Sequence, residues 1–344
     1  MCYYSQLIKN PKYTPNKKNG GVVPYMADKR VAVVAVGCGE CKECRKAKQR
    51  EWQVRLKEDI KHNTNGKFIT LTFSDEGFRK VWEDDIKYEV KLKKSKKKPK
   101  KPRKPLTELK GYDLDNGIAT RAMRYFLERW RKEHKKSLRH WIVTEIGGNN
   151  TERIHIHGIV WCDDLAKVEK HWGYGIVWKG KERQDGKIEN YVNERTVSYI
   201  VKYLTKIDEK HKAYKSIVLT SPGIGKYYIE NPNSLKNKYN GTKTSETYRT
   251  TTGHKIALPI YWRNKIYTEE EREKLWIQKL DKEERWVCGE RISVKNSDKD
   301  YIELVKYHRV RTAYLGYYEP EFIWKQSAYE EARRNMLNGN RVGK

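Results

Sequence analysis

Long apolar runs are absent from the sequence. None approaches the roughly 18 to 20 residues that a membrane-spanning helix requires. The first four residues, Met-Cys-Tyr-Tyr, also lack the charged region and apolar stretch of a signal peptide. We therefore expect neither membrane insertion nor secretion. Only 37% of the 344 residues are hydrophobic, so the sequence predicts a modest core under a highly charged surface.

Acidic residues are scarce relative to basic ones. The chain has 45 Asp and Glu against 74 Lys and Arg, which gives a formal net charge of +29. This imbalance argues against a neutral metabolic enzyme and favours an acidic polymer as the partner. The aromatic residues agree, because 11 Trp and 24 Tyr greatly outnumber 5 Phe. Rings with a polar edge can stack on nucleic-acid bases.

Cysteine is infrequent, and the six present are too few for a disulfide framework in a chain of this length. Three of them, Cys38, Cys41 and Cys44, recur every third residue in a Lys-rich segment. Thiolates at this spacing suit metal ligation in a reducing cytoplasm. Cys2 could complete a tetrahedral Zn²⁺ site that ties the N-terminus to the first helix. Free thiols in a capped turn are the alternative.

The segment 91–105 has no acidic residue and contains ten Lys or Arg. Because Pro99, Pro102 and Pro105 exclude a regular helix, we expect an exposed, mobile insertion. Such a segment is either a solvated loop or a phosphate-binding arm. The candidate DNA-binding side chains in it are Lys93, Lys94, Lys96, Lys97, Lys98, Lys100, Lys101, Arg103 and Lys104.

Hydrophobic periodicity predicts short strands mixed with amphipathic helices. Neither a regular βαβ repeat nor a solenoid repeat is visible, so the predicted class is α+β with a central antiparallel sheet flanked by helices. The predicted strands are 31–36, which we expect to be buried, 68–73, 140–146 and 154–161. The predicted helices are 41–62, 118–135, 194–206 and 269–282.

His155 and His157 are two residues apart on a predicted strand, so both side chains leave the same face of the sheet. Glu145 on the preceding strand could supply a third ligand if the register places it opposite the pair. Two imidazoles and a carboxylate leave open coordination positions, and this mixed shell suits Mg²⁺ or Mn²⁺ beside a phosphate. Two histidines on a solvent-exposed strand face are the alternative.

The predicted helix 194–206 carries two Tyr-x-x-Lys units. Tyr199 and Tyr203 are four residues apart and share a helix face, and Lys202 and Lys206 each follow a tyrosine by three residues. A phenol has an ordinary pKa of about 10, so as a nucleophile it needs a nearby cation or proton acceptor. The alternative is an amphipathic helix whose tyrosine rings line the core.

Together these motifs resemble the HUH endonuclease superfamily of rolling-circle replication initiators. FITLTF at 68–73 looks like the first superfamily motif, HIHGIVW at 155–161 is similar to the second, and YIVKY at 199–203 matches the two-tyrosine form of the third. Three further segments look like the replication initiators of gokushovirus-type microviruses, which are small tailless phages with single-stranded DNA. These segments are 38–52, 221–228 and 258–267.

The resemblance implies a role for each site residue. His155 and His157 would hold the metal with Glu145 as the third ligand, and Tyr199 or Tyr203 would attack the scissile phosphodiester. The products would be a 5′-phosphotyrosine linkage and a free 3′-OH that primes a host DNA polymerase. The other tyrosine would cut the regenerated origin while the first strand is resealed into a circle, without ATP.

The resemblance also implies an organisation and a setting. An RRM-like nuclease core in 67–220 would follow a Cys-containing segment and helix in 1–66 and precede an extension in 221–344. The substrate would be single-stranded DNA at a phage replication origin, in the cytoplasm of a bacterial host cell. The sequence SPGIGK at 221–226 departs from a Walker A loop, so we expect a host helicase to separate the strands.

Two other classes stay open at this point. A non-catalytic nucleic-acid-binding protein would explain the charge and the aromatic residues, but not two Tyr-x-x-Lys units downstream of a Glu/His/His set. A relaxase or transposase of the same superfamily is the second alternative, although relaxases usually have three histidine ligands and a tyrosine near the N-terminus. A metal-dependent phosphodiesterase of another fold would use water and need no tyrosine pair.

Overall fold

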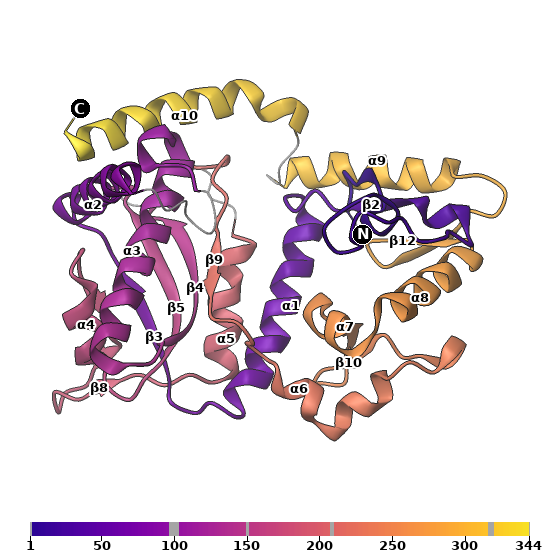
Figure 1. Cartoon of the computed structure of the whole chain (residues 1–344), viewed down its shortest axis with the longest axis horizontal. Helices are drawn as coiled ribbons and strands as arrows, with labels where there is room; N and C mark the ends of the chain where they lie inside the picture. The colour runs from indigo at the N-terminus through magenta and orange to yellow at the C-terminus, as the bar shows by residue number, and fades with distance from the viewer. Residues whose placement is uncertain (1, 96–102, 149–150, 207–209, 316–319, 344) are drawn as a thin grey trace. The chain divides into compact units, whose positions relative to one another are not determined.

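The chain forms two compact units, each of which is described here by itself. The computed structural model describes residues 2–95, 103–148, 151–206, 210–315 and 320–343 (Figure 1). The first unit comprises Met1–Arg55 with Gly225–Glu319, and the second comprises Leu56–Ile224 with Pro320–Lys344.

A five-stranded antiparallel sheet in the order β6-β3-β5-β4-β9 forms the centre of the second unit. Helices flank this sheet, and smaller two-stranded sheets accompany it. The predicted α+β class with a central antiparallel sheet is therefore confirmed. The strands of the central sheet are β3 (Gly66–Leu71), β4 (Arg139–Ile146), β5 (Ile154–Trp161), β6 (Val177–Trp178) and β9 (Val218–Thr220).

Helices cover both faces of the central sheet. Helices α2 (Asp75–Lys94) and α3 (Gly111–His134) lie on one face, and α5 (Glu194–Ile200) lies on the other (Figure 1). The sheet buries its apolar side chains under α3, where Ile118 and Phe126 are fully buried with their neighbours from β4 and β5. The opposite face is free to carry polar side chains over part of its area.

Helix boundaries differ from the sequence pattern in two places. α3 begins well before residue 118, because Leu114 extends its buried stripe by one turn and Asp113 in the first turn suits the helix dipole. α5 ends at Ile200, and Val201–Leu204 continues as a tighter 3-10 helix. The predicted helices 41–62 and 269–282 are confirmed by α1 (Lys42–Ile60) and α8 (Glu269–Asp281).

The prediction of a buried strand at 31–36 is wrong in part. Residues Lys29–Ala32 form a 3-10 helix, and only Val33–Val36 forms a strand, β2. β2 pairs with β1 (Gln6–Lys9) in a two-stranded ribbon whose side chains are mostly exposed. A ribbon of two strands has little area to bury, so the apolar run alone does not identify a core strand.

The first unit has its own aromatic core. Tyr228 stacks on the fully buried Trp262 with ring centroids 4.1 Å apart, and the indole Nε1 donates to the Gly225 carbonyl at 2.8 Å. Its remaining elements are α6 (Tyr227–Glu230), α7 (Ile260–Ile266), α9 (Lys299–Tyr314), β10 (Thr247–Arg249), β11 (Lys255–Ala257), β12 (Glu284–Val287) and β13 (Glu290–Ser293). The second unit also contains α4 (Leu165–Trp172), β7 (Lys181–Glu182), β8 (Ile188–Glu189) and α10 (Pro320–Val342).

Helix α10 is attached to the central-sheet unit by buried charge. Arg334 donates from Nε and Nη2 to both carboxylate oxygens of Asp115 in α3, at 2.7 and 2.8 Å. Neither side chain is more than 1% exposed. Arg333 donates to both oxygens of Glu152, at 2.6 and 2.7 Å. The hydrogen bond from Arg333, together with His211 and against the effect of burial, lowers the pKa of Glu152 to about 2.

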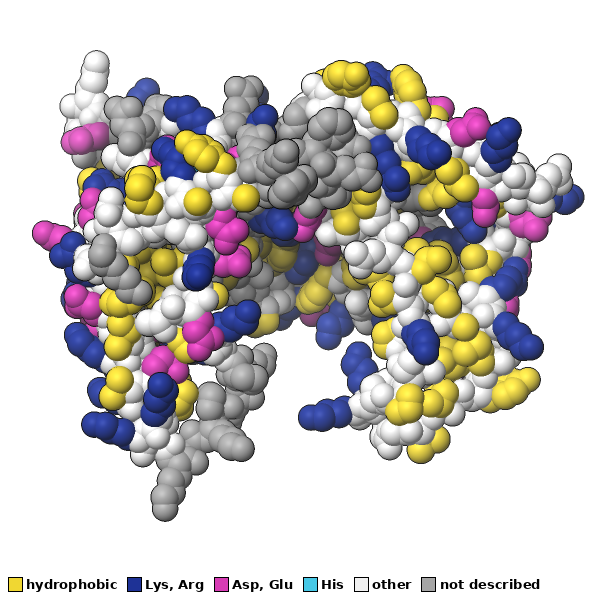
Figure 2. Space-filling view, turned by 90° about the horizontal axis from the view of Figure 1, so that it is seen from above, with side chains coloured by type: hydrophobic (Ala, Val, Ile, Leu, Met, Phe, Trp, Pro, Cys, Tyr) yellow, Lys and Arg dark blue, Asp and Glu magenta, His cyan; other side chains and the backbone are white. Residues whose placement is uncertain are grey.

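Basic side chains are spread widely over the surface. Figure 2 shows Lys and Arg on the visible faces of both units, without one dominant patch. The described helices include none that is both long enough and apolar enough to cross a lipid bilayer.

The buried Arg334–Asp115 pair yields a stability prediction. Arg334→Met should lower the free energy of unfolding by about 3 to 5 kcal/mol, because the Asp115 carboxylate then stays buried without its cation. Adding Asp115→Leu should restore much of the loss, since no unpaired charge remains. Urea unfolding at pH 7 measures both effects. Arg124→Met, at an exposed position of α3, is the control. An Arg334 variant as stable as this control would contradict the prediction.

Candidate active site

The candidate site lies on the sheet face opposite α2 and α3. β5 places His155 directly across from Glu145 of β4, and His157 across from Thr70 of β3. Because strand side chains alternate, the intervening Ile156 points into the core and is fully buried. The register therefore brings together the two histidines and the carboxylate, as the sequence required for a shared site.

His157 is held between two strands. Its Nδ1 lies 3.0 Å from the Thr70 hydroxyl, and its Nε2 lies 2.8 Å from Glu145 Oε2. The Nε2 contact is close but poorly directed, and this buried nitrogen has no aligned hydrogen-bond partner among the described residues. A buried nitrogen of this kind, facing a carboxylate, is what an imidazole ligand presents to a cation.

Glu145 links the strands to the end of the tyrosine helix. Lys206 Nζ donates to Glu145 Oε1, and His157 approaches the other oxygen. Burial raises the pKa of Glu145, but the contacts with His157 and Lys206 outweigh it, and the net pKa is lowered. The carboxylate is therefore charged at neutral pH.

His155 completes the set from a tight environment. Its pKa is lowered by burial and by the neighbouring His157, so the imidazole is neutral at pH 7. A side chain at Gly147 would place its Cβ 2.6 Å from His155 Cε1, so this position needs glycine. The donor atoms of Glu145, His155 and His157 do not all lie within 4.8 Å of one another in the described structure, while Lys206 binds the carboxylate.

The two tyrosines meet at their hydroxyl groups. Tyr199 and Tyr203 have hydroxyl oxygens 3.0 Å apart. The Tyr203 ring lies flat on His157, with ring centroids 4.5 Å apart and planes 3° from parallel. Burial, the hydrogen bond from Tyr199 and the charge of Glu145 all raise the pKa of Tyr203. Tyr199 is more open, with 52% of its surface exposed.

The two lysines have different surroundings. Lys206 is bonded to Glu145 and lies 5.9 Å from the centre of the Tyr203 ring. The Lys202 side chain is exposed and has no ion-pair partner within the described ranges. The Tyr-x-x-Lys units are thus alike in sequence, but only the second belongs to the carboxylate and histidine cluster.

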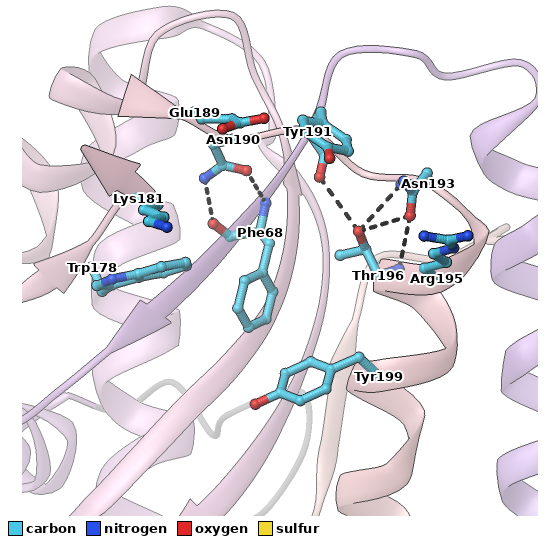
Figure 3. Close-up of a pocket in the computed structure, with 10 residues that line it drawn as sticks. All are labelled: Phe68, Trp178, Lys181, Glu189, Asn190, Tyr191, Asn193, Arg195, Thr196 and Tyr199. Carbon is cyan, nitrogen blue, oxygen red and sulfur yellow. Dashed lines mark hydrogen bonds between the residues drawn. The ribbon is translucent and has the colours of Figure 1, made fainter. Parts of the chain in front are cut away.

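A pocket beside Tyr199 was not found from the sequence. Its volume is about 490 Å³, and it opens between the edge of β3, the β7–β8 hairpin and the start of α5 (Figure 3). The hairpin signal was present as Asp185-Gly186 between two short segments, but those segments have no apolar alternation. The lining residues are Phe68, Trp178, Lys181, Glu189, Asn190, Tyr191, Asn193, Arg195, Thr196 and Tyr199.

The basic segment is only partly described. Lys93 and Lys94 are exposed in the last turn of α2, and Lys104 is exposed beyond the gap. Arg103 instead pairs with Asp85 at 2.7 Å. The expectation of a wholly exposed loop is therefore wrong at its ends, because residues before 95 are helical and Arg103 is packed. Lys96, Lys97, Lys98, Lys100 and Lys101 lie outside the described residues.

The four predicted cysteine ligands converge. The sulfur atoms of Cys2, Cys38, Cys41 and Cys44 all lie within 4.8 Å of one another. Backbone amides of Cys38 and Cys41 donate to Cys2 Sγ and Cys38 Sγ at 3.2 and 3.3 Å, which favours the thiolate form. Close packing extends to Gly37, where a Cβ would lie 3.1 Å from Cys44 Sγ. Four converging thiols suit tetrahedral Zn²⁺.

A second cluster of potential ligands was not predicted. Glu133, His134 and His171 have donor atoms within 4.8 Å of one another at the ends of α3 and α4. Lys170 already binds both oxygens of Glu133, at 2.9 and 3.0 Å. This cluster lies at helix ends, apart from the strand residues of the candidate active site.

Comparison with known proteins identifies one similarity. Residues 66–208 match the sequence model of a family of replication-associated proteins, described by the name ORF2. The match covers less than half of the chain, and it includes the histidines, Glu145 and both tyrosines of the candidate site. No curated protein and no solved structure gives a significant match to the chain.

The cysteine cluster yields a metal prediction. Cys38→Ser should release about one equivalent of Zn²⁺ and lower the melting temperature, because a structural zinc site contributes directly to folding. Metal analysis by mass spectrometry and thermal unfolding measure the two effects. Cys288→Ser, at an exposed cysteine outside the cluster, should change neither. Wild-type protein purified without zinc, and taking none up, would contradict the prediction.

Proposed function

We propose that this protein initiates rolling-circle replication by nicking and rejoining single-stranded DNA through a covalent phosphotyrosine. The observation that carries the proposal is the placement of Tyr203 flat against His157, with the Tyr199 hydroxyl 3.0 Å from that of Tyr203. Two phenols thus share one cluster with Glu145 and His157. The match of this segment to a replication-associated family supports the same activity.

The covalent step exchanges one phosphoester for another. The tyrosine oxygen bonds to the phosphorus, the bond from phosphorus to the 3′ oxygen breaks, and the 3′ oxygen takes up a proton. The DNA is left with a 5′-phosphotyrosine and a 3′-OH. The phenol gives up its proton, and Glu145, which is charged and close enough to raise the pKa of Tyr203, is the acceptor within the cluster.

His155, His157 and Glu145 form a donor set that fits a divalent cation such as Mg²⁺ or Mn²⁺. A cation bound there would polarise the phosphoryl oxygen and offset the charge that develops as the bond breaks. Thr70 orients His157 through Nδ1, and Lys206 holds Glu145 in the same cluster. These contacts fix the directions of the ligands before DNA binds.

Two tyrosines on one helix allow two successive transfers. The phosphotyrosine bond conserves the energy of the phosphodiester, so resealing needs no ATP. One tyrosine holds the 5′ end while a host polymerase extends the 3′-OH, and the other cuts the regenerated origin. The partners in this scheme are a phage origin in single-stranded form, a host polymerase and a host helicase, in the cytoplasm of a bacterial cell.

The charge of the chain suits the substrate. A net charge of +29 attracts a polyanion over its whole surface. Lys93, Lys94 and Lys104 are exposed near the basic segment and are available to contact phosphates. Arg103 is assigned to packing instead, because it is bound to Asp85 and Glu89.

Tyrosine substitutions test the covalent scheme. Replacing both Tyr199 and Tyr203 by Phe should abolish the protein–DNA adduct while DNA binding persists, because the nucleophilic oxygens are lost and the rings stay. Each single variant should make one covalent nick but release no unit-length circle. Mass spectrometry of the DNA-linked peptide locates the adduct, and Lys202→Ala should slow attack by Tyr199 more than attack by Tyr203.

The control for this experiment is Tyr314→Phe, an exposed tyrosine of the first unit. It should leave nicking and circle release unchanged. Adduct formation by the double variant would contradict tyrosine catalysis. Full circle release by either single variant would contradict alternation and leave a single-tyrosine nickase.

Histidine substitutions test the metal dependence. His155→Ala with His157→Ala should abolish nicking and weaken Mn²⁺ binding measured by calorimetry, because both nitrogen ligands are removed. Binding by the wild type should weaken as the pH falls through the lowered pKa of His155, since the protonated ring cannot ligate. His254→Ala, at an exposed position, is the control. Full activity of the double variant, or of the wild type in excess chelator, would contradict the proposal.

A further inference from the structure

We infer that the pocket beside Tyr199 binds one unpaired nucleotide of the DNA strand, with its base stacked on Trp178. The inference rests on the proposed function for its biological meaning, because it places the nucleotide next to the scissile phosphate. It assigns a substrate-binding role to residues of β6, the β7–β8 hairpin and the start of α5, none of which carries out the covalent step.

Aromatic rings form one side of the pocket. Trp178 meets Phe68 edge to face, with ring centroids 5.5 Å apart, and Phe68 meets Tyr199 in the same way at 6.1 Å (Figure 3). Trp178 and Tyr191 are 44% and 60% exposed, which is unusual for such large rings. Exposed rings beside a pocket offer a stacking surface that accepts the face of any base.

The frame of the pocket is rigid. The Asn190 amide accepts from the backbone N–H of Phe68 at 2.8 Å and donates to the Phe68 carbonyl at 2.6 Å. This side chain ties the end of β8 to the edge of β3, as the dashed lines in Figure 3 show. Asn193 caps α5 with a reciprocal contact to Thr196. The rings are therefore held in place before a ligand arrives, which lowers the entropic cost of binding.

Two cations at the rim suit the phosphate of the bound nucleotide. Lys181 and Arg195 are exposed and have no ion-pair partner among the residues that the structure describes. Glu189 lies across from Lys181 in the β7–β8 pair, but no ion pair joins them in the described chain. Free cations beside a stacking surface are the combination that binds single-stranded nucleic acid.

The pocket is continuous with the proposed nucleophiles. Tyr199 lines it, and the hydroxyl of the same residue contacts Tyr203, whose ring lies on His157. A nucleotide held against Trp178 would therefore fix the strand on one side of the reacting phosphate. A volume of about 490 Å³ is within the range of small-ligand pockets, roughly 300 to 1,000 Å³, and admits a single base with its sugar.

Photocross-linking tests the stacking directly. The probe is a thymidine oligonucleotide of about 12 residues, within the usual site sizes for single strands, that carries one 5-iododeoxyuridine. Irradiation of its complex with the full-length protein should link the modified base to Trp178, Phe68 or Tyr191, as mapped by peptide mass spectrometry. Cross-links confined to other aromatic residues would overturn the inference.

Affinity measurements give the second arm. Trp178→Ala should weaken binding of the unmodified oligonucleotide roughly 5- to 150-fold, the range expected for loss of one stacked base. Trp178→Phe should keep most of the affinity, because a ring remains. Trp286→Ala removes a comparably exposed tryptophan from the first unit and should have little effect. Equal affinities for the alanine and phenylalanine variants of Trp178 would overturn the stacking role.

The charged rim is tested by salt dependence. Lys181→Gln with Arg195→Gln should flatten the slope of log affinity against log salt by roughly 0.7 per lost phosphate contact, and both exposed positions tolerate the change without refolding. An unchanged slope would remove these residues from the site. Thymidine monophosphate is the competing ligand: if it binds more tightly than the oligonucleotide, the pocket serves a free nucleotide and the inference fails.

These results separate from those on the nicking activity. Every readout measures binding, so the tests can be run on the variant in which both Tyr199 and Tyr203 are Phe. Retained cross-linking to Trp178 with no covalent adduct in the wild type would support the pocket and contradict the nuclease. A covalent adduct in the wild type with no cross-link to the pocket would do the reverse.

Discussion

The antiparallel pairing of β4 with β5 is the constraint on which the rest of the candidate site depends. It places Glu145 across from His155 and buries Ile156 on the other face. A shift of one residue would move the histidines into the apolar core and the isoleucines out of it. Gly158 reinforces the register, because a Cβ there would collide with the carbonyl oxygen of Trp141. The hydrophobic packing under α3 thus determines which side chains meet the substrate.

A second level of organisation joins this sheet to the tyrosine helix by charge. Lys206 contacts Glu145 from beyond the 3-10 turn, and that carboxylate also faces His157. The tighter turn brings the Tyr203 ring flat onto the same histidine. Strand ligands and tyrosines therefore form one cluster, and a change in any member alters the charge that the others experience. Such half-buried networks are strongly coupled because water screens them poorly.

The end of the chain supports the active strand from a distance in sequence. Arg334 neutralises Asp115 at the start of α3, and Arg333 binds Glu152 in the connection that leads into β5. Glu152 has a backbone φ of 45°, which few residues other than glycine adopt. The ion pairs with α10 hold this residue in place shortly before His155. A helix far from the tyrosines in sequence thus contributes to the position of a ligand.

The sequence by itself determined the features that depend on local periodicity. Alternation in 154–161 placed both histidines on one face, the spacing of Tyr199 and Tyr203 placed both phenols on one side of a helix, and the cysteine spacing identified a cluster that the structure brings together. Periodicity misjudged 31–36, because burial depends on what covers a strand. Only the tertiary structure decided that Tyr203 stacks on His157, that an aromatic pocket lies beside Tyr199 and that α10 braces the sheet. Those contacts join residues far apart in the chain, and no local pattern encodes which of them meet.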